Sequence, residues 1–184
     1  MADLVIVYGP PLTGRNEVAW AIARSMPGRS AVLSADSLLA GAIAVPWEDA
    51  AAELEMVHGQ VRLLVAFYLK HRYHLVVEGP FLFERGGALI SYESHIDQLV
   101  ALMRHLALQS VVVRLDLDAN ELRSRAAATV VPAEAETISR LAAAYRERTG
   151  PNLLTFDAAS NSSQVIAAAV QVELSRLHAL RVGS

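Results

Sequence analysis

The residues with the clearest capacity for chemistry lie near the start of the sequence. They read Gly9-Pro10-Pro11-Leu12-Thr13-Gly14-Arg15-Asn16. The two glycines have the spacing of the phosphate-binding pattern G-x-x-x-x-G-K-[ST], and the segment lies between an apolar run and a helical sequence. Glycines let backbone N–H groups curl around an anion, and a helix N-terminus adds a favourable dipole. The segment therefore predicts a loop that binds phosphate through its backbone.

Two positions of this loop depart from the pattern and leave its chemistry open. Arg15 stands where the pattern has lysine, and Asn16 stands where it has the hydroxyl that holds Mg²⁺. In one interpretation, Arg15 contacts phosphate through its planar fork and acts in catalysis, while the amide oxygen of Asn16 ligates Mg²⁺. In the other, catalysis is impaired and Arg15 is a surface residue of the first helical turn. The backbone donors survive in both cases, so we expect anion binding in both.

Two acidic residues end predicted strands, at the edge where open parallel sheets bind their ligands. Asp36 ends the segment 31–36, and Glu78 comes just before Gly79 at the end of another strand. A carboxylate there can accept a proton from a substrate hydroxyl or hold Mg²⁺. Asp36 is the candidate general base and Glu78 a candidate metal ligand. The alternative is that both are ordinary acids that cap the next helix or face solvent.

A pair of arginines and a set of aromatic residues are further candidates. Arg123 and Arg125 lie on the helix predicted after the fourth strand, where they could close over a nucleotide and neutralise charge in a transition state. Acids are interspersed with them, so a solvated surface of salt bridges is the alternative. The aromatic residues in predicted loops, which could line an acceptor pocket, are Trp47, Phe81, Phe83 and Tyr92.

The elements that must position these residues alternate along the chain. Apolar runs predict five strands, at 4–8, 31–36, 74–79, 110–116 and 153–157. Helical patterns cover 15–25, 48–72, 94–108, 120–129, 134–148 and 162–180, the third opened by a capping box from Ser94 to Asp97. Residues 38–45 and 80–92 are expected to be irregular. Strands that alternate with helices predict a parallel sheet covered on both faces, in one α/β domain over 1–184.

Composition excludes several classes of protein. The net charge of −3 argues against a general nucleic-acid-binding surface, and a chain without cysteine has neither disulfides nor thiolate metal sites. Its 53% of hydrophobic residues argues against disorder, yet no apolar run is long enough to span a bilayer. No targeting segment stands out at the start. We expect a cytoplasmic protein with no nucleic-acid or membrane partner, and of undetermined oligomeric state.

In its order of elements the chain resembles the small P-loop kinases, the adenylate-kinase-like group that includes shikimate, gluconate and chloramphenicol phosphotransferase-like enzymes. The resemblance rests on Gly9 to Asn16, Asp36, Glu78-Gly79, the Arg123/Arg125 pair and the closing Phe156-Asp157-Ala158-Ala159-Ser160. It implies a three-layer α/β/α fold with a five-stranded parallel sheet in the order 2-3-1-4-5. It also implies a short lid-like segment at about 120–148, with no metal-stapled lid, and an adenine contact at the end of the fifth strand.

Two functional classes follow from the loop and the resemblance. The first is a phosphotransferase that uses ATP or another nucleoside triphosphate, with Mg²⁺, to phosphorylate a small hydroxylated metabolite or a nucleoside. The second is a catalytically impaired, kinase-derived protein that binds nucleotide or regulates a partner. Asp36 and the arginine pair favour the enzyme, whereas Arg15 and Asn16 favour the second class.

Overall fold

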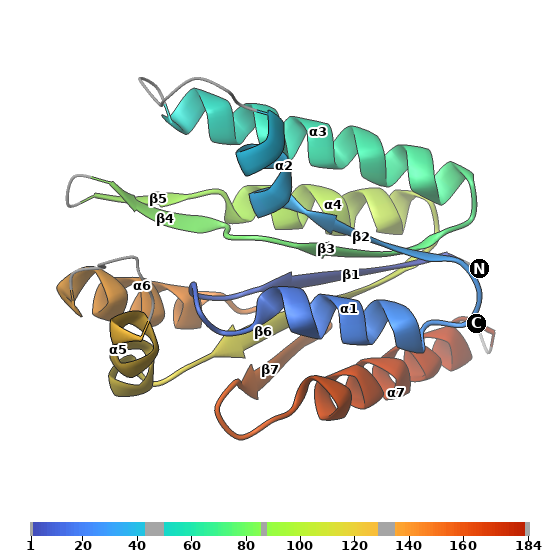
Figure 1. The fold of residues 1–184 in the computed structure, drawn as a ribbon. Helices are drawn as coiled ribbons and strands as arrows, with labels where there is room; N and C mark the ends of the chain where they lie inside the picture. Colours follow the sequence, from blue (N-terminus) through green and yellow to red (C-terminus); the bar gives the residue numbers. More distant parts are fainter. Residues whose placement is uncertain (1, 43–49, 86–87, 129–134, 183–184) are drawn as a thin grey trace.

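The protein is built around a five-stranded parallel sheet. The computed structural model describes residues 2–42, 50–85, 88–128 and 135–182 (Figure 1). The strands lie in the order β2-β3-β1-β6-β7, with bounds Ser30–Ser34, His74–Glu78, Asp3–Tyr8, Gln109–Asp116 and Leu153–Asp157. Every neighbouring pair is parallel. Numbered among themselves, these strands have the order 2-3-1-4-5, which confirms the predicted sheet.

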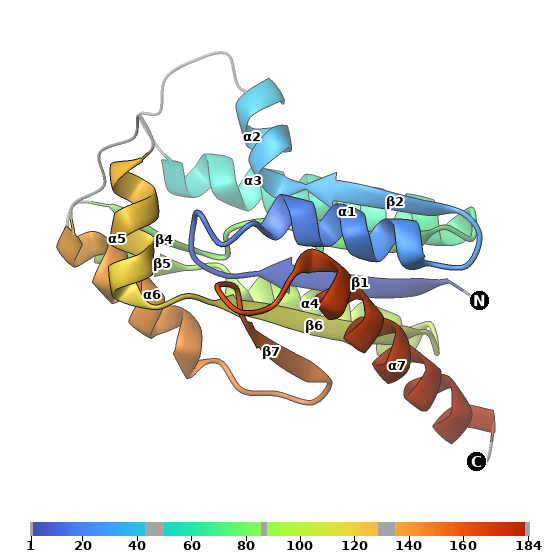
Figure 2. The same ribbon diagram turned by 60° about the horizontal axis from the view of Figure 1, so that its bottom comes forward.

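Helices cover both faces and complete the three layers. Figure 1 shows α1 (Arg15–Ser25) and α7 (Ser163–Val182) on one side and α3 (Ala50–Lys70) and α4 (Glu93–His105) on the other. Figure 2 shows α1 and α7 side by side. The central strand β1 is apolar on both faces because both are covered. Val5 and Val7 pack on the α1 and α7 side, and Leu4 and Ile6 pack on the other.

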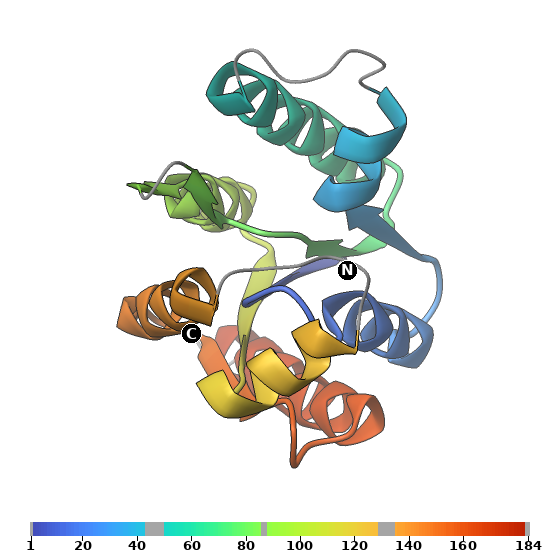
Figure 3. The same ribbon diagram turned by 60° about the vertical axis from the view of Figure 1, so that its left-hand side comes forward.

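The candidate functional residues lie at the edge where the parallel strands end. Figure 3 looks onto this edge, with α5 (Ala119–Ala127) in front of it and α6 (Ala135–Glu147) beside it. The predicted lid-like segment at about 120–148 corresponds to these two helices, apart from 129–134, which lie outside the described residues.

Two segments expected to be irregular are regular instead. Residues Ala35–Ala42 form helix α2, which begins directly after β2 because the Ser34 hydroxyl accepts a hydrogen bond from the backbone N–H of Ser37 at 3.1 Å. Asp36 therefore lies in the first turn of a helix and does not end a strand. Within the expected loop 80–92, β4 (Leu82–Arg85) and β5 (Ala88–Ser91) pair as an antiparallel hairpin.

The predicted capping box is wrong. Helix α4 begins at Glu93, and its N-cap residue, Tyr92, makes no side-chain capping bond. Asp97 instead accepts a hydrogen bond from Arg148, so a partner from another element decides the role of this acid. Among the described residues, no helix is long and apolar enough to cross a membrane.

Candidate functional site

The glycine-rich loop connects β1 to α1, as the spacing predicted. Gly9 has φ 155°, and a Cβ added there would lie 2.4 Å from the carbonyl oxygen of Leu115 on the next strand. Gly14, with φ 80°, is the N-cap residue of α1. The buried Thr13 hydroxyl donates to the Pro10 carbonyl oxygen at 2.8 Å and closes the turn. The loop thus places backbone N–H groups at the start of a helix, although its two prolines donate none.

Arg15 turns back under the loop and does not lie on the surface. Its side chain is only 10% exposed. Nη1 donates to the carbonyl oxygen of Gly9 at 2.6 Å, and Nη2 donates to Oδ2 of Asp36 at 2.8 Å. Nε lies 3.7 Å from Oε2 of Glu78. The fork of the guanidinium therefore joins the loop to both acids that were singled out in the sequence.

The two acids around Arg15 have different surroundings. Glu78 is buried, and its burial raises its pKa, an effect opposed by a hydrogen bond with Ser34 and by the charge of Arg15. The side chain of Asp36 is 46% exposed and can reach solvent or a substrate. Gly79 allows the end of β3 to lie close to the start of α2, since a Cβ at position 79 would lie 2.7 Å from the Cβ of Ala35.

The structure brings one of the two candidate arginines to the loop. Arg125 donates from Nη1 to the Leu12 carbonyl oxygen at 3.0 Å and from Nε to Glu121 at 2.9 Å. Arg123 is exposed and donates to the Ser139 hydroxyl on α6 at 3.3 Å. Arg125 is therefore the arginine that contacts the loop, and the catalytic roles of Arg123 and Arg125 both stay predictions.

A cavity of about 460 Å³ extends from the loop to the turn after β7. Its lining comes from the loop and α1, from Arg125, and from the turn with the start of α7: Thr13, Gly14, Glu17, Val18, Arg125, Ala158, Ala159, Ser160, Asn161, Ser162, Ser163 and Ile166. The segment expected to contact adenine thus forms one wall.

Two lining residues, Glu17 and Ser163, were not candidates from the sequence. The Ser163 hydroxyl donates a hydrogen bond to the carboxylate of Glu17 at 3.2 Å, which joins α7 to α1 at the cavity wall. The position of Glu17 in the first helical turn after the loop could have indicated that its side chain lies at the site.

Asp157 holds the turn that forms this wall. Its carboxylate accepts hydrogen bonds from the backbone N–H of Ala159 at 3.0 Å and from the Ser160 hydroxyl at 2.7 Å. These bonds lower the pKa of Asp157. The side chain of Asn161 also donates to the carbonyl oxygen of Asp157, at 2.9 Å. An ionised Asp157 therefore keeps the backbone of this wall in one shape.

The aromatic residues expected to line an acceptor pocket are in part core residues. Phe81 and Tyr92 are buried and stack on His58, with ring centroids 5.1 and 5.3 Å away. Trp47 lies outside the described residues, and the side chain of Phe83 is not described.

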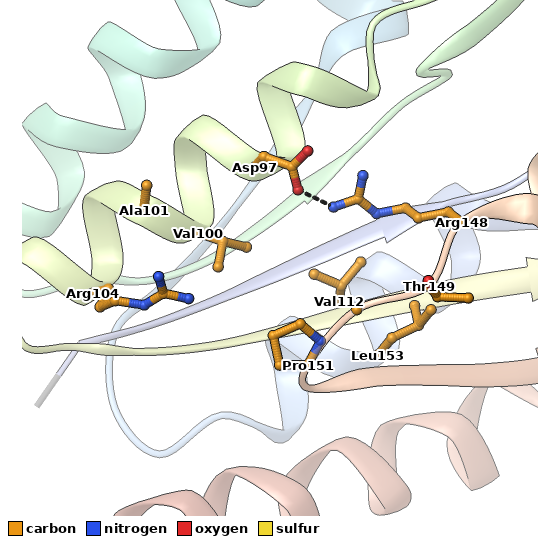
Figure 4. A pocket seen from close by; sticks show the side chains of 10 residues that line it. Asp97, Val100, Ala101, Arg104, Val112, Arg148, Thr149, Pro151 and Leu153 are labelled. Carbon is orange, nitrogen blue, oxygen red and sulfur yellow. Dashed lines mark hydrogen bonds and ion pairs between the residues drawn. The ribbon is translucent and has the colours of Figure 1, made fainter.

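A second cavity of about 260 Å³ lies elsewhere, between α4, β6 and the segment before β7 (Figure 4). It shares no lining residue with the first cavity. Figure 4 shows Asp97 and Arg148 paired at one end and Arg104 at the other. The first cavity, which is lined by the glycine-rich loop and Arg125, is the candidate site.

One of the two predicted metal ligands, Glu78, lies close to a cation of the protein itself. Asn16 is exposed in the first turn of α1, and Glu78 lies beside the guanidinium of Arg15. That guanidinium contacts Asp36 as well, so the space between the two acids does not fit a magnesium ion while Arg15 is in place. No group of three or more acids or histidines in the described part of the chain could hold a metal ion. The metal roles of Asn16 and Glu78 stay predictions.

Comparisons with known proteins show a similarity of fold to solved kinases. No family model matches the chain, and no curated protein matches it. Among solved structures, a gluconokinase from Sinorhizobium meliloti is 18% identical, with a TM-score of 0.61 over 99% of this chain and 97% of that chain. A tunicamycin resistance protein from Deinococcus radiodurans is 14% identical, with a TM-score of 0.66 over 95% and 96%. An APS kinase from Mycobacterium tuberculosis, in complex with AMPPNP and APS, is 16% identical, with a TM-score of 0.61 over 95% and 98%. The chain has the fold of the P-loop kinases.

Proposed function

We propose that this protein binds a nucleoside phosphate at the glycine-rich loop and acts as a kinase-like phosphotransferase on a small hydroxylated acceptor. The observation that carries the proposal is the continuous cavity from Thr13 and Gly14 to the turn after β7. Phosphates would lie on the backbone N–H groups at the start of α1. The base would lie along Ala158 to Ser163, which form the far wall of the cavity. A solved structure of similar fold, the APS kinase, is a complex with AMPPNP.

One residue that lines the cavity and one beside the glycine-rich loop have the chemistry that phosphoryl transfer needs. Arg125 lies over the loop, where its charge can neutralise the transferred group. The half-exposed carboxylate of Asp36 can orient an acceptor hydroxyl and accept its proton. Positioning and charge stabilisation supply most of the catalysis in this class of reaction. An acceptor near Asp36 would complete the site.

One observation favours binding without turnover as a second candidate function. The guanidinium of Arg15 is hydrogen-bonded to Asp36, the proposed base. Arg15 and an acceptor hydroxyl would therefore compete for the same carboxylate oxygen, Oδ2 of Asp36. A nucleotide-binding or regulatory role that has lost transfer is consistent with this contact.

Binding and turnover can be separated by experiment. Titration calorimetry with ATP and ADP, with and without Mg²⁺, should show binding. The variant Arg125→Ala should weaken it by about 1.5–3 kcal/mol, the size of a hydrogen bond to a charged group. Arg123→Ala is the matched control on the same helix and should leave the affinity unchanged. Absence of binding by any nucleoside phosphate would refute the proposal. Binding without phosphoryl transfer to a panel of hydroxylated acceptors would favour the second function.

A further inference from the structure

The sharpest departure from the phosphate-loop pattern is also the most closely held side chain in the site. Arg15 is bonded to the Gly9 carbonyl oxygen and to Asp36, and it lies 3.7 Å from Glu78. A guanidinium cannot lose its proton in a protein, so its charge is permanent. With the side chain only 10% exposed, solvent screens this charge little. The cluster therefore contains two carboxyl groups and one fixed cation between them.

The same two carboxyl groups would otherwise suit a divalent cation. Magnesium in phosphoryl-transfer sites is held by one or two carboxylates together with substrate phosphates. Here the guanidinium reaches both acids and also donates to the loop. A metal ion brought to the same acids would meet a like charge that cannot titrate away. The pattern's serine or threonine hydroxyl is also replaced, by Asn16.

We propose that Arg15 is a built-in cation that takes the place of the divalent metal between Asp36 and Glu78. The site is therefore expected to accept the metal-free form of its ligand, a nucleoside phosphate with uncoordinated phosphate oxygens. This last step rests on the proposed function, whereas the exclusion of metal by Arg15 does not.

The planar guanidinium of arginine can contact the loop and both acids at once, which the compact ammonium of lysine cannot. Arginine presents several donors in a planar fork, so it can bond the Gly9 carbonyl and the Asp36 carboxylate at once and still lie beside Glu78. Lysine is a compact point charge on a shorter stem. The three contacts hold Arg15 in the cluster. Removal of Arg15 would leave the buried Glu78 without this cation beside it, which is unfavourable for a buried carboxylate.

The first experiment uses magnesium alone and needs no nucleotide. Melting temperatures are measured with magnesium chloride and with sodium chloride at equal ionic strength. The native protein should show no difference between the two salts. Arg15→Gln leaves two acids without their cation, so magnesium should bind there and raise its melting temperature. The double variant Arg15→Gln with Asp36→Asn should lose that response.

The second experiment measures the affinity of the native protein for ADP in EDTA and in excess magnesium, and it stands even if Arg15→Gln does not fold. Affinity in EDTA that equals or exceeds that in magnesium supports the inference. Magnesium that tightens ADP binding about tenfold or more overturns it and leaves the proposed nucleotide site intact. A native protein stabilised by magnesium alone, or a folded Arg15→Gln that does not respond to it, also overturns the inference. If ADP binds under neither condition, both the proposed function and the inference that the ligand binds without metal are refuted. The melting experiment alone then decides whether Arg15 excludes magnesium.

Discussion

At the scale of single residues, the site depends on a few side chains with more than one partner. Arg15 joins the loop to Asp36 on α2 and lies beside Glu78 on β3. Thr13 closes the loop, and Arg125 reaches it from α5. The contacts of Arg15 with the two acids and of Arg125 with the loop connect segments that are distant in the sequence. A substitution at one of them is therefore expected to change the geometry of the site more than the global stability.

Asp36→Asn tests the proposed general base. The amide keeps the shape of the side chain and loses its charge, so turnover should fall by roughly 10²–10⁴-fold. Nucleotide affinity should stay close to the native value, because the phosphates lie on backbone donors. Initial rates and calorimetry on the same protein check both expectations, and Ser37→Ala, at the next position, is the control. Native turnover in Asp36→Asn would rule out this role.

The two loop glycines are expected to differ in their tolerance of a side chain. At Gly14 a Cβ would have no neighbour within 4 Å, so Gly14→Ala should cost only the strain of φ 80°, about 1–2 kcal/mol. At Gly9 the Cβ would lie 2.4 Å from a backbone oxygen of Leu115. Overpacking against a sheet strand adds roughly 1–3 kcal/mol. Urea unfolding of the two variants compares them, and equal losses would contradict the geometry.

At the scale of elements, the contact between α3 and α4 is built from stacked rings. His58 on α3 stacks on His95 of α4 with centroids 4.6 Å apart, and both are buried. His95 also bonds Glu55 at 2.9 Å and Arg62 at 2.7 Å on the α3 side. Since the imidazole of His58 lies in the middle of this stack, its protonation should weaken the packing of α3 against α4.

His58 should make the stability depend on pH. Burial lowers its pKa to about 4, with the charges of His95 and Arg62 acting in the same direction and Glu55 against them. Since the unfolded chain binds this proton more tightly, the stabilisation is complete above about pH 6.5 and is lost as the pH falls towards 4. The loss should be on the order of 3 kcal/mol. Chemical unfolding across this range should show it in the native protein and in His105→Gln, an exposed control, but much less in His58→Phe. An unchanged pH profile in His58→Phe would contradict the assignment.

The end of α6 should be fastened to α4 by Arg148. It donates to the Glu93 carbonyl oxygen at 3.4 Å and to the carboxylate of Asp97 (Figure 4). The side chain of Asp97 is 67% exposed, so the coupling in a double-mutant cycle of Arg148→Ala and Asp97→Ala should be about 0.2–1 kcal/mol. Arg104→Ala is the control, because Arg104 lines the same cavity and has no ion pair within the described ranges. A coupling free energy near zero would show that the Arg148–Asp97 pair does not contribute to stability.

At the scale of the whole molecule, the sheet should be most stable at its centre. β1 is hydrogen-bonded to β3 and to β6, and all of its residues are buried. β7 pairs with β6 alone, and two of its five residues are exposed. Hydrogen exchange should therefore be slowest in β1, where opening needs global unfolding, and faster in β7. Equal protection of the two strands would indicate that the sheet opens only as one unit.

The order of the elements and the position of the loop could be predicted from the sequence alone. Helix α1 and strand β7 have the predicted bounds, because hydrophobic periodicity and glycine spacing are local signals. The hairpin β4–β5 was missed although Gly86-Gly87 between its strands is a hairpin signal, since its four-residue strands are too short for a clear alternation. Helix α2 was missed because its start depends on a hydrogen bond that the backbone N–H of Ser37 donates to the Ser34 hydroxyl.

Only the tertiary structure decided which of the candidate residues meet. Arg123 and Arg125 are two positions apart on a helix and cannot face the same way, but the sequence does not say which one faces the loop. The packing of α5 turns Arg125 to Leu12 and leaves Arg123 with Ser139. In the same way, the sequence identified Arg15 as the departure from the pattern, and the fold gave it Asp36 and Glu78 as partners. The reason is that backbone form follows from near neighbours, whereas the partners of a charged side chain come from segments that only the folded chain brings together.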